Sequence, residues 1–145
     1  MKLNLDPLLQ KILDAPVGKV ENTIREALNC DVHLDIIEQN QEPGSNFVRK
    51  ITINAKDFPV IRATVNFDSD VIPEKITEEL LRKKEGIGTI LTRNNIQPER
   101  KVISLNFEND NKKVIRKYQI VIENTVWFEI SEEIRLDFIN TSKNG

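Results

Sequence analysis

An arginine at position 49 falls where the sequence pattern predicts an apolar side chain. One side of the segment 46–53 reads Phe47, Arg49, Ile51 and Ile53. Because side chains alternate between the two faces of a strand, Arg49 is predicted to point the same way as its apolar neighbours. A buried guanidinium needs an anion, and its planar fork of donors suits a protein carboxylate or a ligand carboxylate. The alternative is an edge-strand arginine whose head reaches water.

Other side chains that could do chemistry are scarce. The chain has one histidine, His33, and one cysteine, Cys30. These are too few ligands for a structural zinc site or a histidine-rich metal centre, so we expect no metal. No serine lies in a nucleophile elbow, and no Walker loop or dinucleotide-binding glycine motif is present, so we expect no cofactor.

Length and composition favour one soluble domain that neither binds nucleic acid nor spans a membrane. The 145 residues fit a single domain, 1–145, large enough to enclose a small cavity. A formal net charge of -2 predicts no general affinity for nucleic acid. We expect a cytoplasmic protein, since no stretch is apolar enough to be a signal peptide or to span a bilayer. The oligomeric state is left open by the sequence.

The periodicity of apolar residues predicts helices at the start and in the middle of the chain, and strands elsewhere. Two short helices are expected within the first thirty residues, with a bend at 16–18, and a third helix at 73–84. The six predicted strands begin near Val32, Asn46, Val60, Val102, Val114 and Val126. A polar loop at 39–46 is long enough to act as a flap, and 140–145 reads as a frayed tail.

Hairpin-connected strands with segregated helices describe an α+β domain. We therefore predict a six-stranded antiparallel sheet with helices packed on it.

Several landmarks stand in a recognisable order along the chain. They are the segments 47–51, 60–65, 85–91 and 126–130, reading FVRKI, VIRATV, EGIGTIL and VWFEI. In this order the chain resembles the chorismate pyruvate-lyase family, above all its compact branch of 4-hydroxybenzoate synthases. The resemblance implies flap loops that close over an internal ligand cavity. Ligand-sensing domains of some bacterial transcription regulators are similar in fold.

The resemblance implies roles for individual residues. Arg49 takes the place of the arginine that holds the substrate carboxylate, and Glu129 that of a glutamate near the ring hydroxyl. The backbone amide of Ile87 matches a second contact to the carboxylate, and Val17 falls near another backbone contact. Arg62 matches a further cavity arginine, although its strand position predicts a surface residue.

The activity implied is that of an enzyme, a carbon–oxygen lyase. It converts the small-molecule substrate chorismate into 4-hydroxybenzoate, for a pathway such as quinone biosynthesis, and pyruvate. Cofactor-free elimination in a closed cavity fits the sparse chemistry, since positioning alone supplies roughly 7–11 kcal/mol in favourable systems. Arg49 and Glu129 would be its catalytic pair.

Three alternatives accompany this hypothesis. The domain could bind an aromatic or sugar acid without turnover, or it could be a lyase for another carboxylated substrate. Regulators that use such a domain normally carry a separate DNA-binding helix-turn-helix, for which we expect no room in this chain. Glu129 could instead form a structural salt bridge with Arg49 or Arg116.

Overall fold

The computed structural model describes residues 7–108 and 112–136, and every structural statement below refers to these. The predicted tail at 140–145 lies outside them. The helices are α1 (Pro7–Asp14), α2 (Val20–Leu28), α3 (Glu74–Leu81) and α4 (Ile87–Arg93). The strands are β1 (Val32–Gln41), β2 (Asn46–Ala55), β3 (Phe58–Asp68), β4 (Glu99–Glu108), β5 (Lys113–Ile122) and β6 (Thr125–Arg135).

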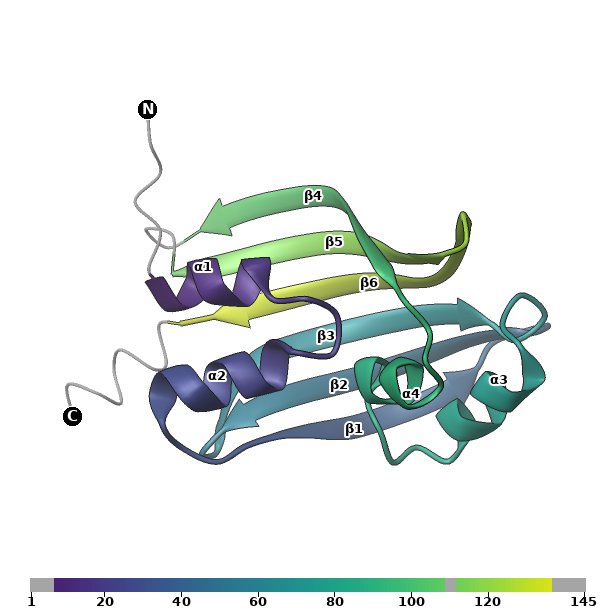
Figure 1. The fold of residues 1–145 in the computed structure, drawn as a ribbon, viewed down its shortest axis with the longest axis horizontal. Coiled ribbons are helices and arrows are strands. Elements are labelled where there is room, and N and C mark those ends of the chain that lie inside the picture. The colour runs from purple at the N-terminus through teal and green to yellow at the C-terminus, as the bar shows by residue number, and fades with distance from the viewer. Residues whose placement is uncertain (1–6, 109–111, 137–145) are drawn as a thin grey trace.

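The six strands form one antiparallel sheet in the order β1-β2-β3-β6-β5-β4. Chain neighbours pair as hairpins within each half, and β3 pairs with β6 to join the two halves. All four helices lie on the same face of this sheet (Figure 1). The α+β class and the six-stranded antiparallel sheet predicted from the sequence are confirmed.

Strict alternation sets the inner face of the central strands. On β3 the buried row is Ile61, Ala63, Val65 and Phe67. On β5 it is Val114, Arg116, Tyr118, Ile120 and Ile122, and on β6 it is Phe128, Ile130, Glu132 and Ile134. Apolar side chains on one face and polar ones on the other are typical of an antiparallel sheet with one solvated face. Three charged side chains break the apolar pattern on this inner face: Arg49, Arg116 and Glu132.

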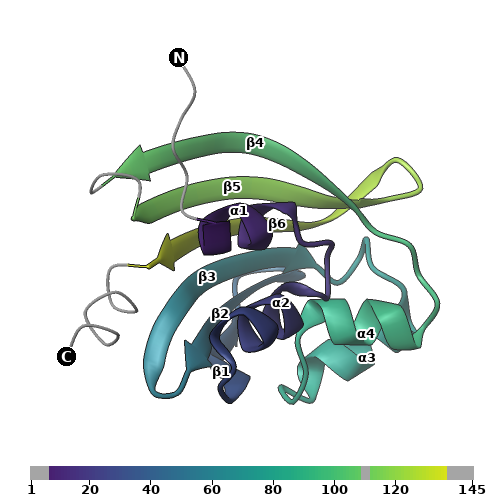
Figure 2. The ribbon, with the colours of Figure 1, turned by 60° about the vertical axis from the view of Figure 1, so that its left-hand side comes forward.

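The helices divide the core into two clusters. The first lies beneath α1 and α2 and includes Leu9, Ile12 and Ile24. The second lies beneath α3 and α4 and includes Leu80 and Leu91. Figure 2 shows the sheet curving around the helices. Where the two clusters meet, the sheet is covered by the loop before α2, the turn before α4 and the first turns of both helices.

Two boundaries predicted from the sequence are wrong. The segment 39–46 is not a flap, because β1 continues to Gln41 and only four residues connect it to β2. Its polar side chains belong to an edge strand that pairs with β2 in register, with Gln39 opposite Arg49. The third helix ends at Leu81, and Lys83 follows with φ at 56°, a left-handed conformation typical of helix ends.

Among the described residues, no helix has the length and apolar character needed to cross a membrane.

Candidate functional site

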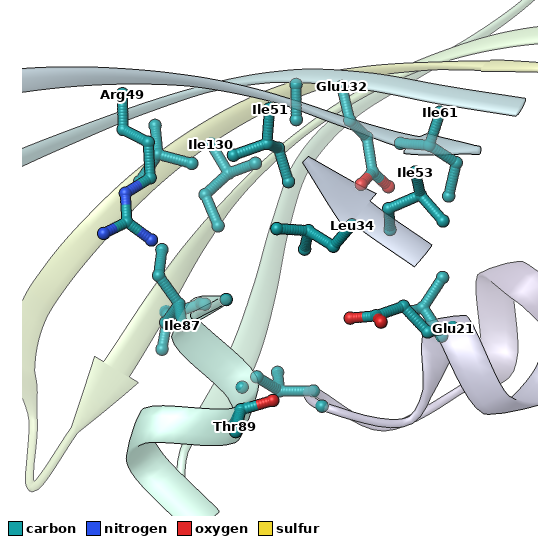
Figure 3. Close-up of a pocket in the computed structure, with 18 of the residues that line it drawn as sticks. Glu21, Leu34, Arg49, Ile51, Ile53, Ile61, Ile87, Thr89, Ile130 and Glu132 are labelled. Carbon is teal, nitrogen blue, oxygen red and sulfur yellow. The ribbon is translucent and has the colours of Figure 1, made fainter. Parts of the chain in front are cut away.

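A cavity of about 90 Å³ lies between the sheet and the loops that cover it. Its floor is apolar and comes from both core clusters: Leu34, Ile51, Ile53, Ile61, Ile120 and Ile130. Charged side chains lie at its edges (Figure 3). An apolar pocket with a few convergent polar groups is the usual form of a small-molecule site.

Arg49 projects from β2 into this cavity and is fully buried. Its Nε donates a hydrogen bond to Oε1 of Gln39 on the neighbouring strand at 2.8 Å. Its Nη2 donates to the carbonyl oxygen of Leu80 at 2.8 Å, and its Nη1 to that of Glu85, also at 2.8 Å. Both carbonyls belong to the end of α3 and the turn that follows, so the guanidinium ties this turn to the sheet.

Neutral groups alone surround the Arg49 guanidinium. Three of its five N–H groups have acceptors, and among the described residues no carboxylate forms an ion pair with it. Burial lowers the pKa of Arg49 to about 10. Arginine nevertheless keeps its proton at neutral pH, so the group is a buried cation without a counter-ion. It is therefore suited to bind an anion that enters the cavity.

A second charged group lies deeper, on β5 and β6. The Nε of Arg116 donates to Oε1 of Glu132 at 2.5 Å, and the hydroxyl of Tyr118 lies 3.4 Å from the other carboxylate oxygen. Burial, and next the charge of Glu132, raise the pKa of Tyr118. The guanidinium groups of Arg100 and Arg116 each lie 4.9 Å from the centre of the Tyr118 ring. Glu132 thus brings a negative charge to the cavity wall, with Arg116 beside it.

The same two arginines hold the loop between α1 and α2. Arg116 donates through Nη1 to the carbonyl of Leu13 at 3.1 Å, and Arg100 donates through Nη1 to the carbonyl of Ala15 at 2.6 Å. Arg49 does the same for the turn before α4. Each of the two segments that cover the cavity is therefore fixed to the sheet by guanidinium-to-carbonyl hydrogen bonds that are at least partly buried.

These two covering segments touch at a pair of glycines. A Cβ built on Gly88 would lie 2.2 Å from the Cα of Gly18 and 2.6 Å from its nitrogen. Gly18 has φ at 88°, which L side chains rarely adopt. The contact covers part of the cavity above its floor, so we call the pair of segments 15–19 and 85–89 the roof.

The structure brings three predicted site residues together. Arg49, Val17 and Ile87 all line the cavity, the first from the floor and the other two from the roof. Ile87 is the first residue of α4. Their binding roles stay predictions.

The predicted position of Glu129 in the cavity is wrong. This residue lies on the exposed face of β6, opposite Asn66 and Gln119 on the neighbouring strands. The alternation that buries Phe128 and Ile130 turns Glu129 outward. The alternative, a structural salt bridge of Glu129 with Arg49 or Arg116, is therefore also wrong.

Arg62 is likewise exposed, as its strand position predicted.

The carboxylates that do line the cavity, Glu132 and Glu21, were missed. A usable signal existed for Glu132, because it interrupts the apolar row of Phe128, Ile130 and Ile134 as Arg49 interrupts its own. No such signal existed for Glu21, which looks like an ordinary acidic residue in the first turn of a helix.

Within 7–108 and 112–136, no group of three or more histidine, cysteine, aspartate or glutamate side chains could hold a metal ion.

Comparison with known proteins gives a likeness in structure alone. No protein-family model matches the chain, and no curated protein matches it. The chain is similar to the ligand-binding domain of a protein from Bordetella bronchiseptica assigned to the GntR family of transcriptional regulators. The identity is 7%, the match covers 73% of this chain and 86% of that one, and the TM-score is 0.51. A GntR-family regulator from Bacillus cereus matches over 74% of this chain and 92% of its own, at 11% identity and a TM-score of 0.48.

The chain has the chorismate lyase-like fold, which the Bordetella ligand-binding domain shares.

Proposed function

We propose that this chain is a binding domain for a small organic acid, which it holds in the cavity with the acid's carboxylate on Arg49. The observation that carries the proposal is that Arg49, a fully buried cation that lines a cavity, has no counter-ion within residues 7–108 and 112–136. Removing a charge from water without pairing it is unfavourable by several kcal/mol or more. A ligand carboxylate would supply the missing charge.

The remaining donors suit a carboxylate. Nη1 and Nη2 each have one acceptor and two hydrogens, so one N–H of each is left for a ligand. A carboxylate that accepts from both would form a bidentate pair, the geometry in which arginine binds acids most strongly. The roof would then enclose the bound acid.

The size of the cavity limits the ligand. An engineered cavity of about 150 Å³ binds benzene, so the 90 Å³ observed here is small for an aromatic acid. A short-chain acid fits best, and a ring acid requires the roof to move outward at the contact of Gly18 with Gly88. The apolar floor of the cavity favours a ligand with a hydrocarbon body.

The likeness to the Bordetella protein supports a binding role. That domain is described as ligand-binding and belongs to a transcriptional regulator. A sensor of this kind changes its affinity for a partner when its ligand binds and does not need turnover. We propose the same for this chain, without a named partner.

A lyase acting on chorismate is the second candidate. One observation favours it: Glu132 places a carboxylate in the same cavity as Arg49. This is the pairing that the resemblance assigned to Glu129, now supplied by a residue on the inner face of the same strand. The deciding assay incubates the purified protein with chorismate and measures pyruvate. Pyruvate formation by the wild-type protein would establish the lyase and remove the purely binding role.

Thermal unfolding with a panel of ligands tests the binding proposal. The panel pairs each acid with its neutral amide: propionate, pentanoate, benzoate and 4-hydroxybenzoate with the four corresponding amides. A ligand at about 100 times its Kd stabilises the folded protein by roughly 2.7 kcal/mol. We expect at least one acid to raise the unfolding temperature by several degrees more than its amide.

The matched variants are Arg49→Met and Arg62→Met. Each variant removes one arginine, and the two arginines lie on neighbouring strands. Arg62, however, is exposed and lies outside the cavity. The stabilisation by acids is expected to disappear in the first variant and to persist in the second. Equal stabilisation by acids and amides, or a response that survives Arg49→Met, would refute the proposal.

A further inference from the structure

Glu21 lines the same cavity as Arg49 and comes from the opposite side. It lies in the first turn of α2, and its half-buried carboxylate points into the space above the apolar floor (Figure 3). Arg49 and Glu21 lie at opposite sides of that view, with Leu34 between them. The cavity thus has a cation at one end and a carboxylate at the other.

The Glu21 carboxylate has no hydrogen-bond or ion-pair partner among the described residues. Burial raises its pKa, and the charges of Arg25 on α2 and His33 on β1 oppose that rise. Neither neighbour contacts it directly: Arg25 donates to the carbonyl of Val32 at 2.8 Å, and His33 pairs with Asp35 at 3.3 Å. The carboxylate is therefore partly desolvated and keeps its acceptor capacity free.

A structural role does not account for this orientation. An acidic residue in the first turn of a helix stabilises the helix by its charge, and it does so best when it stays hydrated on the surface. Glu21 instead loses hydration by facing the cavity, which disfavours its charged form. A hydrogen-bond donor inside the cavity would compensate for that loss.

We infer that Glu21 is a specificity-determining residue, which accepts a hydrogen bond from a hydroxyl or ammonium group at the end of the ligand remote from its carboxylate. This inference rests on the proposed function, because it assumes that Arg49 holds the carboxylate. The ligand class is then an acid with an apolar body and a donor at its far end. A hydroxy acid and an amino acid with a terminal ammonium group share that chemistry.

Three acids of equal chain length separate the contributions: pentanoate, 5-hydroxypentanoate and 5-aminopentanoate. Their Kd values are measured by NMR titration of the full chain. A hydrogen bond to a charged group contributes about 1.5–3 kcal/mol, which is a factor of about 10 to 150 in Kd. At least one donor-bearing acid is therefore expected to bind about tenfold or more tightly than pentanoate, and the better of the two identifies the donor.

Two variants at one position test the residue. Glu21→Gln removes the charge, and Glu21→Leu removes the acceptor as well. The advantage of an ammonium ligand is expected to fall to less than about threefold in both variants, and that of a hydroxyl ligand chiefly in Glu21→Leu. Glu26 is an exposed acid of the same helix, so Glu26→Gln serves as the control and is expected to change none of the three Kd values.

The outcomes separate this inference from the function on which it rests. If wild type binds pentanoate through Arg49 but binds all three acids equally, the role of Glu21 is refuted and the acid-binding function stands. If both Glu21 variants weaken the binding of all three acids by the same factor, Glu21 only supports the structure of the site and does not recognise the donor. If none of the three acids binds to wild type, both this inference and the acid-binding function are refuted for the class of short-chain acids.

Discussion

Gly18 and Gly88 meet backbone to backbone, although seventy positions separate them in the chain, and a Cβ on Gly88 would lie 2.2 Å from the Cα of Gly18. One glycine belongs to the loop after α1, and the other to the first turn of α4. Their contact joins the two halves of the roof.

Gly88→Ala is expected to force the roof apart. Its methyl group would clash with backbone atoms, which cannot move aside without shifting the loop. Overpacking of this kind destabilises proteins by about 1–3 kcal/mol. We expect a lower urea midpoint, together with faster hydrogen exchange of the amides in 15–19.

Gly86→Ala is the matched control for that variant. Its Cβ would lie 2.9 Å from Cδ1 of Leu34, the flexible end of a side chain. The loss of stability is expected to be clearly smaller than for Gly88→Ala. If the two variants lose equal stability, the backbone contact is not what closes the roof.

Breaking the buried pair of Arg116 and Glu132 is expected to destabilise the protein strongly. Both side chains are almost fully buried, at 2% and 6% exposure. Removing one partner of such a pair destabilises by about 3–5 kcal/mol, because the other charge stays buried alone. Glu132→Gln is expected to lower the free energy of unfolding by an amount in that range, measured by urea unfolding.

The double variant Arg116→Met with Glu132→Leu shows whether charge or shape dominates. Replacing both partners with apolar residues of similar size is often neutral or stabilising. We expect the double variant to recover most of the stability that Glu132→Gln loses. A double variant less stable than the single one would mean that the hydrogen bond from Arg116 to Leu13 matters more than the charge pair.

The pH dependence of stability is expected to change when Arg93 is removed. Hydrogen bonds from Arg93 are the largest cause that lowers the pKa of Glu79 and of Glu85, which ties α3 to α4. A lowered folded-state pKa contributes stability that is present above the unfolded value of 4.5 and is lost as the pH falls through the folded value. Arg93→Met is therefore expected to be less stable than wild type at neutral pH, and this difference is expected to shrink as the pH falls below 4.5 through the lowered folded-state pKa values. A pH-independent difference in urea unfolding would contradict this.

The contribution of Glu21 to stability changes with pH in the opposite direction. Its pKa is raised in the folded protein, so the folded state binds the proton more tightly than the unfolded chain does. Stability from this group is present below the unfolded value of 4.5 and is lost as the pH rises through the raised folded value. Without ligand, Glu21→Gln is expected to gain stability relative to wild type between pH 4 and pH 7. A difference that shrinks over that range would show that Glu21 is not desolvated by the cavity.

The sequence predicts the fold and one end of the site because both depend on local alternation. Arg49 interrupts an apolar row, and a period of two residues is enough to turn it inward. Glu132 and Arg116 interrupt their own rows in the same way, so the same reasoning applied to β5 and β6 identifies them. Glu129 was chosen by resemblance against that pattern, and the pattern is what the structure follows.

Contacts between distant segments could not be predicted. The partner of Arg49 on β1, Gln39, reads as part of a polar loop until its register with β2 is known. The meeting of Gly18 with Gly88 depends on how two helix pairs pack on one sheet. Glu21 enters the site through the same packing, since helix periodicity alone does not show which side of α2 borders a cavity.

The central claim is that Arg49 recognises a carboxylate inside the closed cavity. The most direct measurement is a thermodynamic cycle by isothermal titration calorimetry. It compares pentanoate with pentanamide, on wild type and on Arg49→Met. Because a charged hydrogen bond contributes about 1.5–3 kcal/mol, wild type is expected to prefer the acid by about tenfold or more, and the variant is expected to show no preference. Equal affinity of wild type for acid and amide, or the same preference in Arg49→Met, would contradict the account.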